Sequence, residues 1–235
     1  MTQPAGLDRC FAFINAQLQP PDKPGSHPAG RVQKRAVTIS RQAGCGALVV
    51  AESLANLLQT HSPKDTPPWT VFDRNLMDKV LADHNLPARL AKFLPEDRMT
   101  EMQDIMDELF GLRPPSWTVV QHTSETILQL AELGNVILVG RGGAVIAAPL
   151  PQVFHVRLVA PLEKRIEHAR EFYGMSLKAA RDFCPREDRG RRRYLKKYFE
   201  ADIDDPLLYH IILNTGLMSY DQAAQTIAEA VLSRS

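Results

Sequence analysis

The stretch AVTISRQAGCGALVVAESLANLLQT, residues 36–60, decides the fold of this chain. Its first five residues form a short β-rich run, and QAGCG at 42–46 is a glycine-containing turn. The next residues, 47–60, carry apolar side chains at helical spacing. A strand, a glycine turn and a helix in this order are typical of the first unit of a nucleotide-binding domain.

Further β-rich runs follow along the chain, and helical segments separate them. The runs are 69–73, 135–140, 153–160 and 208–215. Residues 74–133 contain mostly helical segments, and a closing helix is expected over 219–234 with Ser219 as its N-cap. Strands that alternate with helices predict an α/β domain of three layers, in which a mainly parallel five-stranded sheet is covered on both faces.

The first 34 residues are predicted to form a separate region. Leu7, Phe11, Ile14 and Leu18 recur at helical spacing, which indicates a short amphipathic helix. Residues 19–31 are rich in Pro and Gly and have no periodicity, as in a linker. We expect the helix either to dock on the main domain, residues 35–235, or to mediate self-association as a homodimer.

The bulk composition is that of an ordinary globular protein. The chain has 235 residues, 44% of them hydrophobic and 23% charged, and a net charge of +1, so no overall field attracts nucleic acid or a membrane surface. Its three cysteines are too few and too far apart for a disulfide framework or a zinc site. With no signal peptide and no membrane-spanning run in the sequence, we expect a cytoplasmic protein that neither enters a membrane nor holds a metal ion with its own ligands.

The turn after residue 40 is the first candidate binding site, because ligands of parallel sheets bind beyond the carboxyl ends of the strands. Small residues let backbone N–H groups point at an anion, and the start of a helix favours negative charge. The predicted cofactor-binding residues are Ser40, Arg41, Gln42, Gly44, Cys45, Gly46 and Ala47. The same helix start is expected to lower the pKa of the Cys45 thiol.

This turn lacks two side chains of a complete Walker A motif. Lys and then Ser or Thr would follow the last glycine, where this chain has Ala47 and Leu48. A tight turn with no ligand is therefore one alternative. A dinucleotide site with Asp73 on the ribose is another, although Val49 occupies the position of its third small residue.

Six motifs in order resemble the cytidylate kinase-like family over about residues 36–231. They are TISRQAGCG (38–46), FDRNLM (72–77), NVILVGRGGAVI (135–146), FHVRLVAPLEKRI (154–166), REDRGRRRYLKKYF (186–199) and DDPLLYHIILNTGLMSYDQAAQTI (204–227). The resemblance implies a P-loop kinase fold with a helical monophosphate-binding insertion over 74–133 and a mobile lid over 176–200. It further implies ATP and Mg²⁺ as cofactors and a nucleoside monophosphate, CMP or dCMP first, or a related small phosphate acceptor.

At one position of the turn this chain differs from the family, and the difference leads to two alternative expectations about activity. The family usually has Gly-Arg where this chain has Ala47-Leu48, so an arginine that would replace the Walker lysine is missing. The first expectation is phosphoryl transfer from ATP. The alternative is a nucleotide-binding regulatory protein that has lost catalysis.

Arginines carry most of the remaining signal, because phosphoryl transfer needs cations that clamp oxygens. Arg189, Arg192 and Arg193 share one helix face and are predicted to act catalytically by closing over the transferred group. Asp188 would orient an arginine. The predicted substrate-binding residues are Asp73, Arg74, Arg141 and Asp188. Two alternatives remain for the basic run: a solvated helix face, or an RNA-binding patch, although nucleic acid is not the expected partner.

Overall fold

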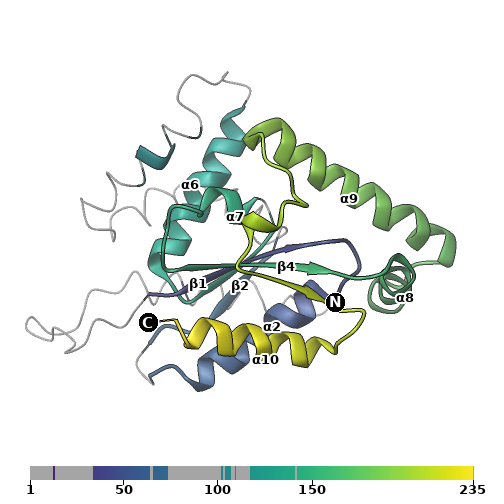
Figure 1. The fold of residues 1–235 in the computed structure, drawn as a ribbon, viewed down its shortest axis with the longest axis horizontal. Helices are drawn as coiled ribbons and strands as arrows, with labels where there is room; N and C mark the ends of the chain where they lie inside the picture. Colours follow the sequence, from purple (N-terminus) through teal and green to yellow (C-terminus); the bar gives the residue numbers. More distant parts are fainter. Residues whose placement is uncertain are drawn as a thin grey trace, which may run out of the picture.

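Five strands form a single parallel sheet in the order β2-β3-β1-β4-β5 (Figure 1). The computed structural model describes residues 34–63, 66–73, 117–140 and 142–234, together with Phe13, Met102, residues 104–106 and Leu109. The strands are β1 (Ala36–Arg41), β2 (Thr70–Phe72), β3 (Val136–Val139), β4 (Val153–Val159) and β5 (Ile211–Asn214). The predicted α/β class with a five-stranded parallel sheet is therefore confirmed.

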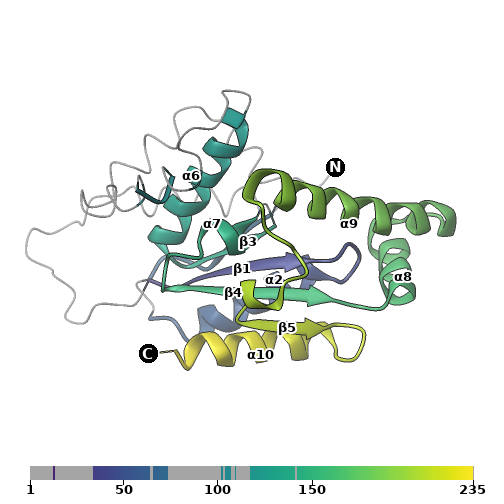
Figure 2. The same ribbon diagram turned by 45° about the horizontal axis from the view of Figure 1, so that its top comes forward.

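Helices cover both faces of this sheet, as Figure 2 shows. One face packs on α2 (Ala47–Thr60) and α10 (Tyr220–Leu232) through a core that includes Val37 and Ile39 of β1. The opposite face packs on α6 (Thr118–Leu133) and the short α7 (Gly143–Ile146). Because helices cover both faces of the sheet, the first four residues of β1, Ala36–Ile39, are all buried, the polar Thr38 included.

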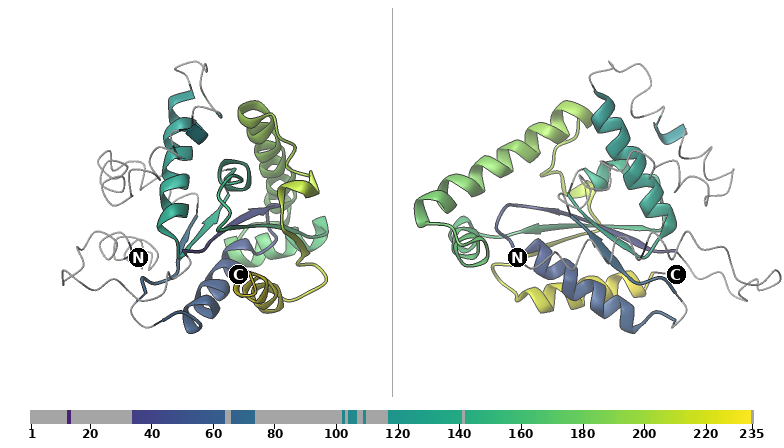
Figure 3. Two further views of the ribbon diagram at one scale, coloured as in Figure 1. Left: turned by 60° about the vertical axis from the view of Figure 1, so that its left-hand side comes forward. Right: turned by 180° about the vertical axis from the view of Figure 1, so that it is seen from behind.

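Two helices extend beyond the carboxyl ends of the strands. They are α8 (Leu162–Tyr173), which ends at Gly174 with a φ of 65°, and α9 (Leu177–Phe199), whose N-cap Ser176 accepts a hydrogen bond from the Ala179 amide. Figure 3 shows α9 running from α8 back toward α6. The Trp117 and Tyr198 rings, 4.9 Å apart, join the far end of α9 to the start of α6.

The last strand starts later than the sequence pattern predicts, whereas the last helix starts at the predicted residue. Strand β5 begins at Ile211 rather than 208, because Asp205 and Pro206 start a 3-10 turn over Pro206–Leu208 and the Asp205 side chain accepts a hydrogen bond from the Leu207 amide. Ser219 caps α10 as predicted, in a reciprocal arrangement with Gln222.

The N-terminal helix expected over 7–18 is represented among the described residues by Phe13. This side chain is fully buried, and its ring meets the Phe72 ring edge-on at 6.0 Å. That contact favours docking on the main domain. The rest of the 1–34 region, apart from Lys34, and nearly all of 74–116 lie outside the described residues. No helix in the described part of the chain is long and apolar enough to cross a membrane.

Candidate functional site

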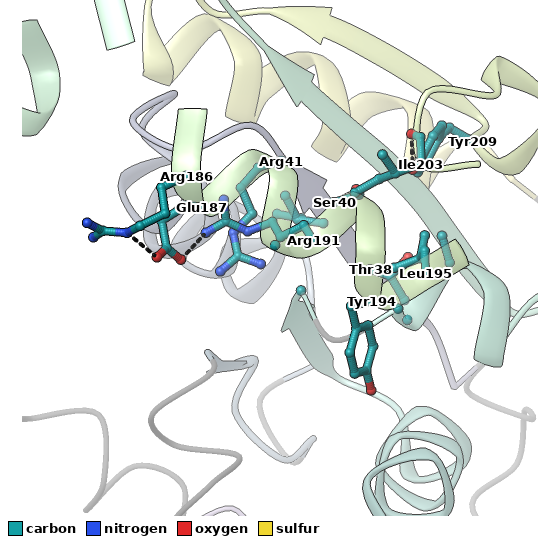
Figure 4. Close-up of a pocket in the computed structure, with 16 residues that line it drawn as sticks. Thr38, Ser40, Arg41, Arg186, Glu187, Arg191, Tyr194, Leu195, Ile203 and Tyr209 are labelled. Atoms are coloured by element: carbon teal, nitrogen blue, oxygen red, sulfur yellow. Dashed lines mark hydrogen bonds and ion pairs between the residues drawn. The ribbon is translucent and has the colours of Figure 1, made fainter. Parts of the chain in front are cut away.

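A cavity of about 320 Å³ lies at the carboxyl edge of the sheet. At this point the strand order reverses, with β3 on one side of β1 and β4 on the other. Strand β1 lies between β3 and β4, and ligands bind at such a reversal point. The end of β1, the loop from β3 into α7, and one face of α9 line the cavity (Figure 4). The polar side chains that line it are those of Thr38, Ser40, Arg41, Arg186, Glu187, Arg191, Tyr194 and Tyr209.

Arg41 is the most unusual of these residues. Burial, followed by repulsion from Arg191, lowers the pKa of its guanidinium to about 10. Gly140 provides room for the group, since a Cβ there would lie 1.9 Å from Arg41 Nη1. Among the described residues, none forms a hydrogen bond or ion pair with the Arg41 guanidinium. A desolvated cation of this kind favours an anionic ligand.

Arg191 supplies a second cation from α9, and Figure 4 shows it beside Arg41. Its Nη1 lies 3.4 Å from Asp188 Oδ1, and its Nη2 lies 3.7 Å from Glu187 Oε2. These carboxylates precede Arg191 by three and four residues, so they share its helix face. They hold the guanidinium at the cavity wall close to Arg41.

Asp188 also ties α9 to the turn after β1. Its Oδ1 accepts a hydrogen bond of 2.7 Å from the Ala43 amide, and its Oδ2 lies 2.6 Å from Nη1 of Arg165 in α8. The Arg165 side chain, only 9% exposed, also donates to the carbonyls of Ala160 and Ala43. The predicted role of Asp188 in orienting an arginine agrees with this geometry, whereas Asp188 does not line the cavity.

Ser40 has its hydroxyl engaged within the protein. It accepts from Arg157 Nη1 at 3.0 Å and lies 3.2 Å from the Tyr209 hydroxyl, which donates to the Ile203 carbonyl. Arg157 is buried in β4 and pairs with Asp204, which also binds Arg192 of α9. The network fixes Ser40 at the cavity floor and anchors α9 to the sheet.

The glycine turn itself is packed against other parts of the chain. The Gln42 side chain accepts from the Ala160 amide at 3.0 Å, and a Cβ on Gly44 would lie 2.3 Å from the Arg165 carbonyl oxygen. At Gly46 a Cβ would meet the Tyr220 ring at 2.3 Å. Of the seven predicted cofactor-binding residues, Ser40 and Arg41 line the cavity, and Gln42, Gly44, Cys45, Gly46 and Ala47 do not.

The turn nevertheless keeps one property of an anion site. The N-cap of α2 is Gly46 in the left-handed region, with no side-chain cap and no acidic residue in the first turn. The positive end of a 14-residue helix therefore has no carboxylate of its own first turn to offset it.

The pKa expected for Cys45 is wrong in direction. Burial raises the pKa of this thiol to about 11, with Arg41 acting against that effect. Its Sγ lies 3.0 Å from the Gln42 carbonyl oxygen and 3.7 Å from the carbonyl oxygen of Leu158 in β4. Desolvation therefore outweighs the charges of the neighbouring arginines at this thiol.

The predicted lid arginines point away from the cavity. Arg189, Arg192 and Arg193 are exposed and do not line it, whereas Arg186 and Arg191 do. Helical spacing grouped the first three correctly on one face, but the packing of α9 turns the opposite face inward. The pair Glu187 and Arg191, four residues apart, was the sequence signal for the face of α9 that lines the cavity.

The predicted acceptor-binding residues are only partly described. Asp73 follows β2 and is near enough for its charge to raise the pKa of Arg41, against the larger effect of burial. Arg74 and Arg141 lie outside the described residues, although Gly140 and Gly142, the neighbours of Arg141, line the cavity. In the described ranges, no group of three or more His, Cys, Asp and Glu side chains is arranged to hold a metal ion.

Comparison with known proteins gives a family match over most of the chain. The model of the cytidylate kinase-like family matches residues 36–217. A crystal structure of an uncharacterized protein from Eubacterium ventriosum superposes with a TM-score of 0.57 at 20% identity, over 86% of this chain and 99% of that one. This likeness supports the fold alone.

Curated relatives match shorter segments. Cytidylate kinases from Pyrobaculum aerophilum and Ignicoccus hospitalis are 34% and 30% identical over 42% and 45% of this chain, and the matches span 53% and 61% of their own lengths. A protein described as uronate isomerase from Corynebacterium glutamicum is 31% identical over 47% of this chain, but only 21% of that protein is matched. The chain thus covers less than two thirds of each of these relatives.

Proposed function

We propose that this chain, which belongs to the cytidylate kinase-like family, transfers a phosphoryl group from ATP to a nucleoside monophosphate. CMP or dCMP is the first acceptor to test, since relatives named cytidylate kinase share this region of the chain. The reaction would take place in the cavity at the carboxyl ends of β1 and β3.

One observation carries this proposal: Arg41 and Arg191 bring two positive charges to one cavity wall, and Arg41 has no carboxylate bound to it among the described residues. Burial, and after it repulsion from Arg191, lowers the Arg41 pKa, so holding this cation in the cavity has an electrostatic cost. A phosphate group would offset that cost and accept hydrogen bonds from both guanidinium groups. A cavity built for a neutral ligand would gain nothing from this arrangement.

The residues divide into a donor side and an acceptor side. Arg41 would hold the donor phosphates at the cavity wall, in place of the Walker lysine. Asp73, Arg74 and Arg141 would hold the acceptor at the ends of β2 and β3. Arg191 would stabilise the negative charge that develops during transfer. The sequence pattern assigned this role to Arg189, Arg192 and Arg193.

In the proposed reaction an oxygen of the acceptor phosphate forms a bond to the terminal phosphorus of ATP. The bond from that phosphorus to its bridging oxygen breaks, and the electron pair leaves with ADP. Fixed cations near the bridging and terminal oxygens stabilise this charge movement. Magnesium ions in such sites are held mainly by substrate phosphates and one or two carboxylates, and Asp73 is the carboxylate near Arg41 that fits this role.

The test is an ADP-release assay with ATP, Mg²⁺ and each nucleoside monophosphate in turn, at high enzyme concentration. We expect turnover with at least one acceptor and a preference for a cytidine nucleotide. Direct detection of the nucleoside diphosphate would separate transfer from ATP hydrolysis. The absence of diphosphate with every acceptor would overturn the kinase proposal.

A second candidate is a nucleotide-binding regulator without catalysis. Ala47 and Leu48 favour it, because neither provides the ammonium or hydroxyl that the Walker motif supplies. Calorimetry that detects ATP binding, combined with no product in the assay above, would favour the regulator. Formation of the nucleoside diphosphate at an ordinary rate would exclude a regulator without catalysis.

A further inference from the structure

Strand β5 forms one edge of the sheet and, among the described strands, pairs with β4 alone. The Val159 carbonyl of β4 accepts a hydrogen bond from the Thr215 amide, which directly follows β5. Because alternate amides of a strand point the same way, those of Leu213 and Ile211 face β4 as well. The amide and carbonyl of Ile212 therefore point to the free edge of the sheet.

This free edge lacks the features that usually prevent an edge strand from pairing. Residues 211–214, IILN, include no proline and no charged side chain. Ile212 is 41% exposed, so part of its apolar side chain lies in water. Figure 2 shows β5 at the border of the sheet, beside β4. The edge can therefore bond to another extended strand.

Two strongly exposed leucines flank β5. Leu207 precedes the strand and is 90% exposed, and Leu217 follows it and is 84% exposed. Neither belongs to a hydrophobic cluster of the described residues. Both are equally far from Ile212 along the chain, one on each side. The apolar surface at this edge is thus arranged symmetrically about Ile212.

A second copy of β5, placed antiparallel on the edge, matches both features. With a twofold axis at Ile212, the Ile212 amide and carbonyl of each copy bond to those of the other. The same register brings Leu207 of each copy beside Leu217 of the partner subunit. Within the paired strands no like charges lie opposite each other, because residues 211–214 carry none.

We propose that the free edge of β5 joins two copies of the chain into a homodimer with one continuous sheet. The positions of the two leucines select a second copy rather than an unrelated strand, because the twofold axis matches each leucine with the other. The N-terminal helix is not needed for this contact, since Phe13 packs on Phe72 of its own chain. Such a dimer would form whether or not the chain transfers phosphate.

The dimer should dissociate on dilution. Stable interfaces of standard size bury about 800 Å² on each partner. A strand of four residues with one isoleucine and two leucines provides a smaller apolar centre than that. We therefore expect a Kd of about 1–100 µM.

The test is sedimentation equilibrium at chain concentrations on both sides of that range. The samples are the wild-type chain, Leu207→Lys, Leu217→Asp, an equimolar mixture of these two variants, and Val119→Asp. Val119→Asp is the matched control, because Val119 is also strongly exposed, at 73%, but lies in α6. Circular dichroism checks that each variant is folded.

We expect the wild-type chain and Val119→Asp to form equally stable dimers. Leu207→Lys and Leu217→Asp should each raise the Kd by about 10-fold or more, because a charge would be buried against a leucine. In the mixture, the introduced lysine of one copy meets the introduced aspartate of the other, and the remaining Leu207 meets the remaining Leu217. A heterodimer should therefore form with nearly wild-type affinity.

Three results would overturn the proposal. The first is a wild-type chain that stays monomeric over the whole concentration range. The second is a dimer that neither leucine variant weakens, since the contact would then lie elsewhere. The third is a mixture that sediments as the separate variants do, because the two copies would then not meet in the antiparallel register about Ile212.

Discussion

The two sides of the junction between β1 and α2 differ in what their polar groups bind. On the side of the glycine turn, the protein binds itself: Asp188 accepts from the Ala43 amide, and the Gln42 side chain accepts from the Ala160 amide. On the side of the cavity, Arg41 keeps a positive charge with no bound carboxylate in the described part of the chain. A glycine-rich motif thus locates the junction, whereas the balance of charge identifies where an anion would bind.

Removal of the Arg41 charge should have the largest effect on the cavity side of the junction. We expect Arg41→Gln to lower kcat by about 100- to 1,000-fold, because a cation at developing phosphate charge would be lost. Its stability should not fall, since a desolvated cation beside Arg191 is removed. Turnover of each acceptor and thermal unfolding measure the two effects.

Two further variants make that result specific. Lys178→Gln removes an exposed charge of α9 outside the cavity and should leave kcat unchanged. Arg193→Gln tests the face that helical spacing selected, and a loss equal to that of Arg41→Gln would restore the sequence-based assignment. Wild-type turnover in Arg41→Gln would contradict the arginine cavity.

The second prediction concerns the tie between α9 and the glycine turn. Asp188→Asn leaves the buried Arg165 guanidinium without its carboxylate, so we expect the free energy of unfolding to fall by about 3 kcal/mol. Urea unfolding measures this change. Glu167→Gln is the matched control, because its pair with Lys164 is exposed on both sides and should contribute about 0–1 kcal/mol. Equal, small losses of unfolding free energy in both variants would mean that the Asp188 contacts do not stabilise the glycine turn.

The third prediction tests whether the turn is closed. With a pKa near 11 instead of the ordinary 9.0, the Cys45 thiol should alkylate about 100-fold more slowly in the folded chain than after unfolding, because the thiolate is the reactive form. Peptide mass spectrometry after iodoacetamide pulses measures the rate at this cysteine. Rapid labelling of folded protein would show instead that solvent reaches the turn and that the helix dipole governs the thiol.

The smallest expected effect is the change of stability with pH that His155, below the cavity, causes. His155 Nδ1 lies 2.8 Å from Thr38 Oγ1 under the cavity, and burial, with repulsion from His210 and Arg234, lowers the His155 pKa to about 4. The unfolded chain therefore takes up this proton at higher pH than the folded chain does. Stability should fall as the pH drops from about 6.5 toward 4, by about 1 kcal/mol between roughly pH 7 and pH 5.5.

The pH prediction is checked by comparing how steeply stability changes with pH in the wild-type chain and in His155→Gln. Burial also lowers the pKa of His168 and His210, so they tilt the stability of the wild-type chain in the same direction. His155→Gln should remove only its own share of the slope in urea unfolding at several pH values. An unchanged slope would mean that His155 does not stay neutral beneath the cavity.

Local patterns were sufficient for the elements of the fold. Apolar runs of strand length gave the five strands, and Ser219 marks the start of α10 because its capping hydrogen bonds are a local property. The short α7 was missed, because four residues next to two glycines carry no helical period. The glycine turn and the resemblance also located the site, since β1 must end at the carboxyl edge of a parallel sheet.

Local patterns were therefore enough to place the sheet, its covering helices and the edge of the sheet where the cavity lies. Tertiary structure alone decided which arginine faces the cavity, which carboxylate takes the Ala43 amide, and that the Cys45 pKa rises. The physical reason is that burial and charge pairing depend on groups far apart in the chain: Asp188 and Ala43 are separated by 145 positions. Periodicity says which side chains share a helix face, but only packing sets the direction in which that face turns.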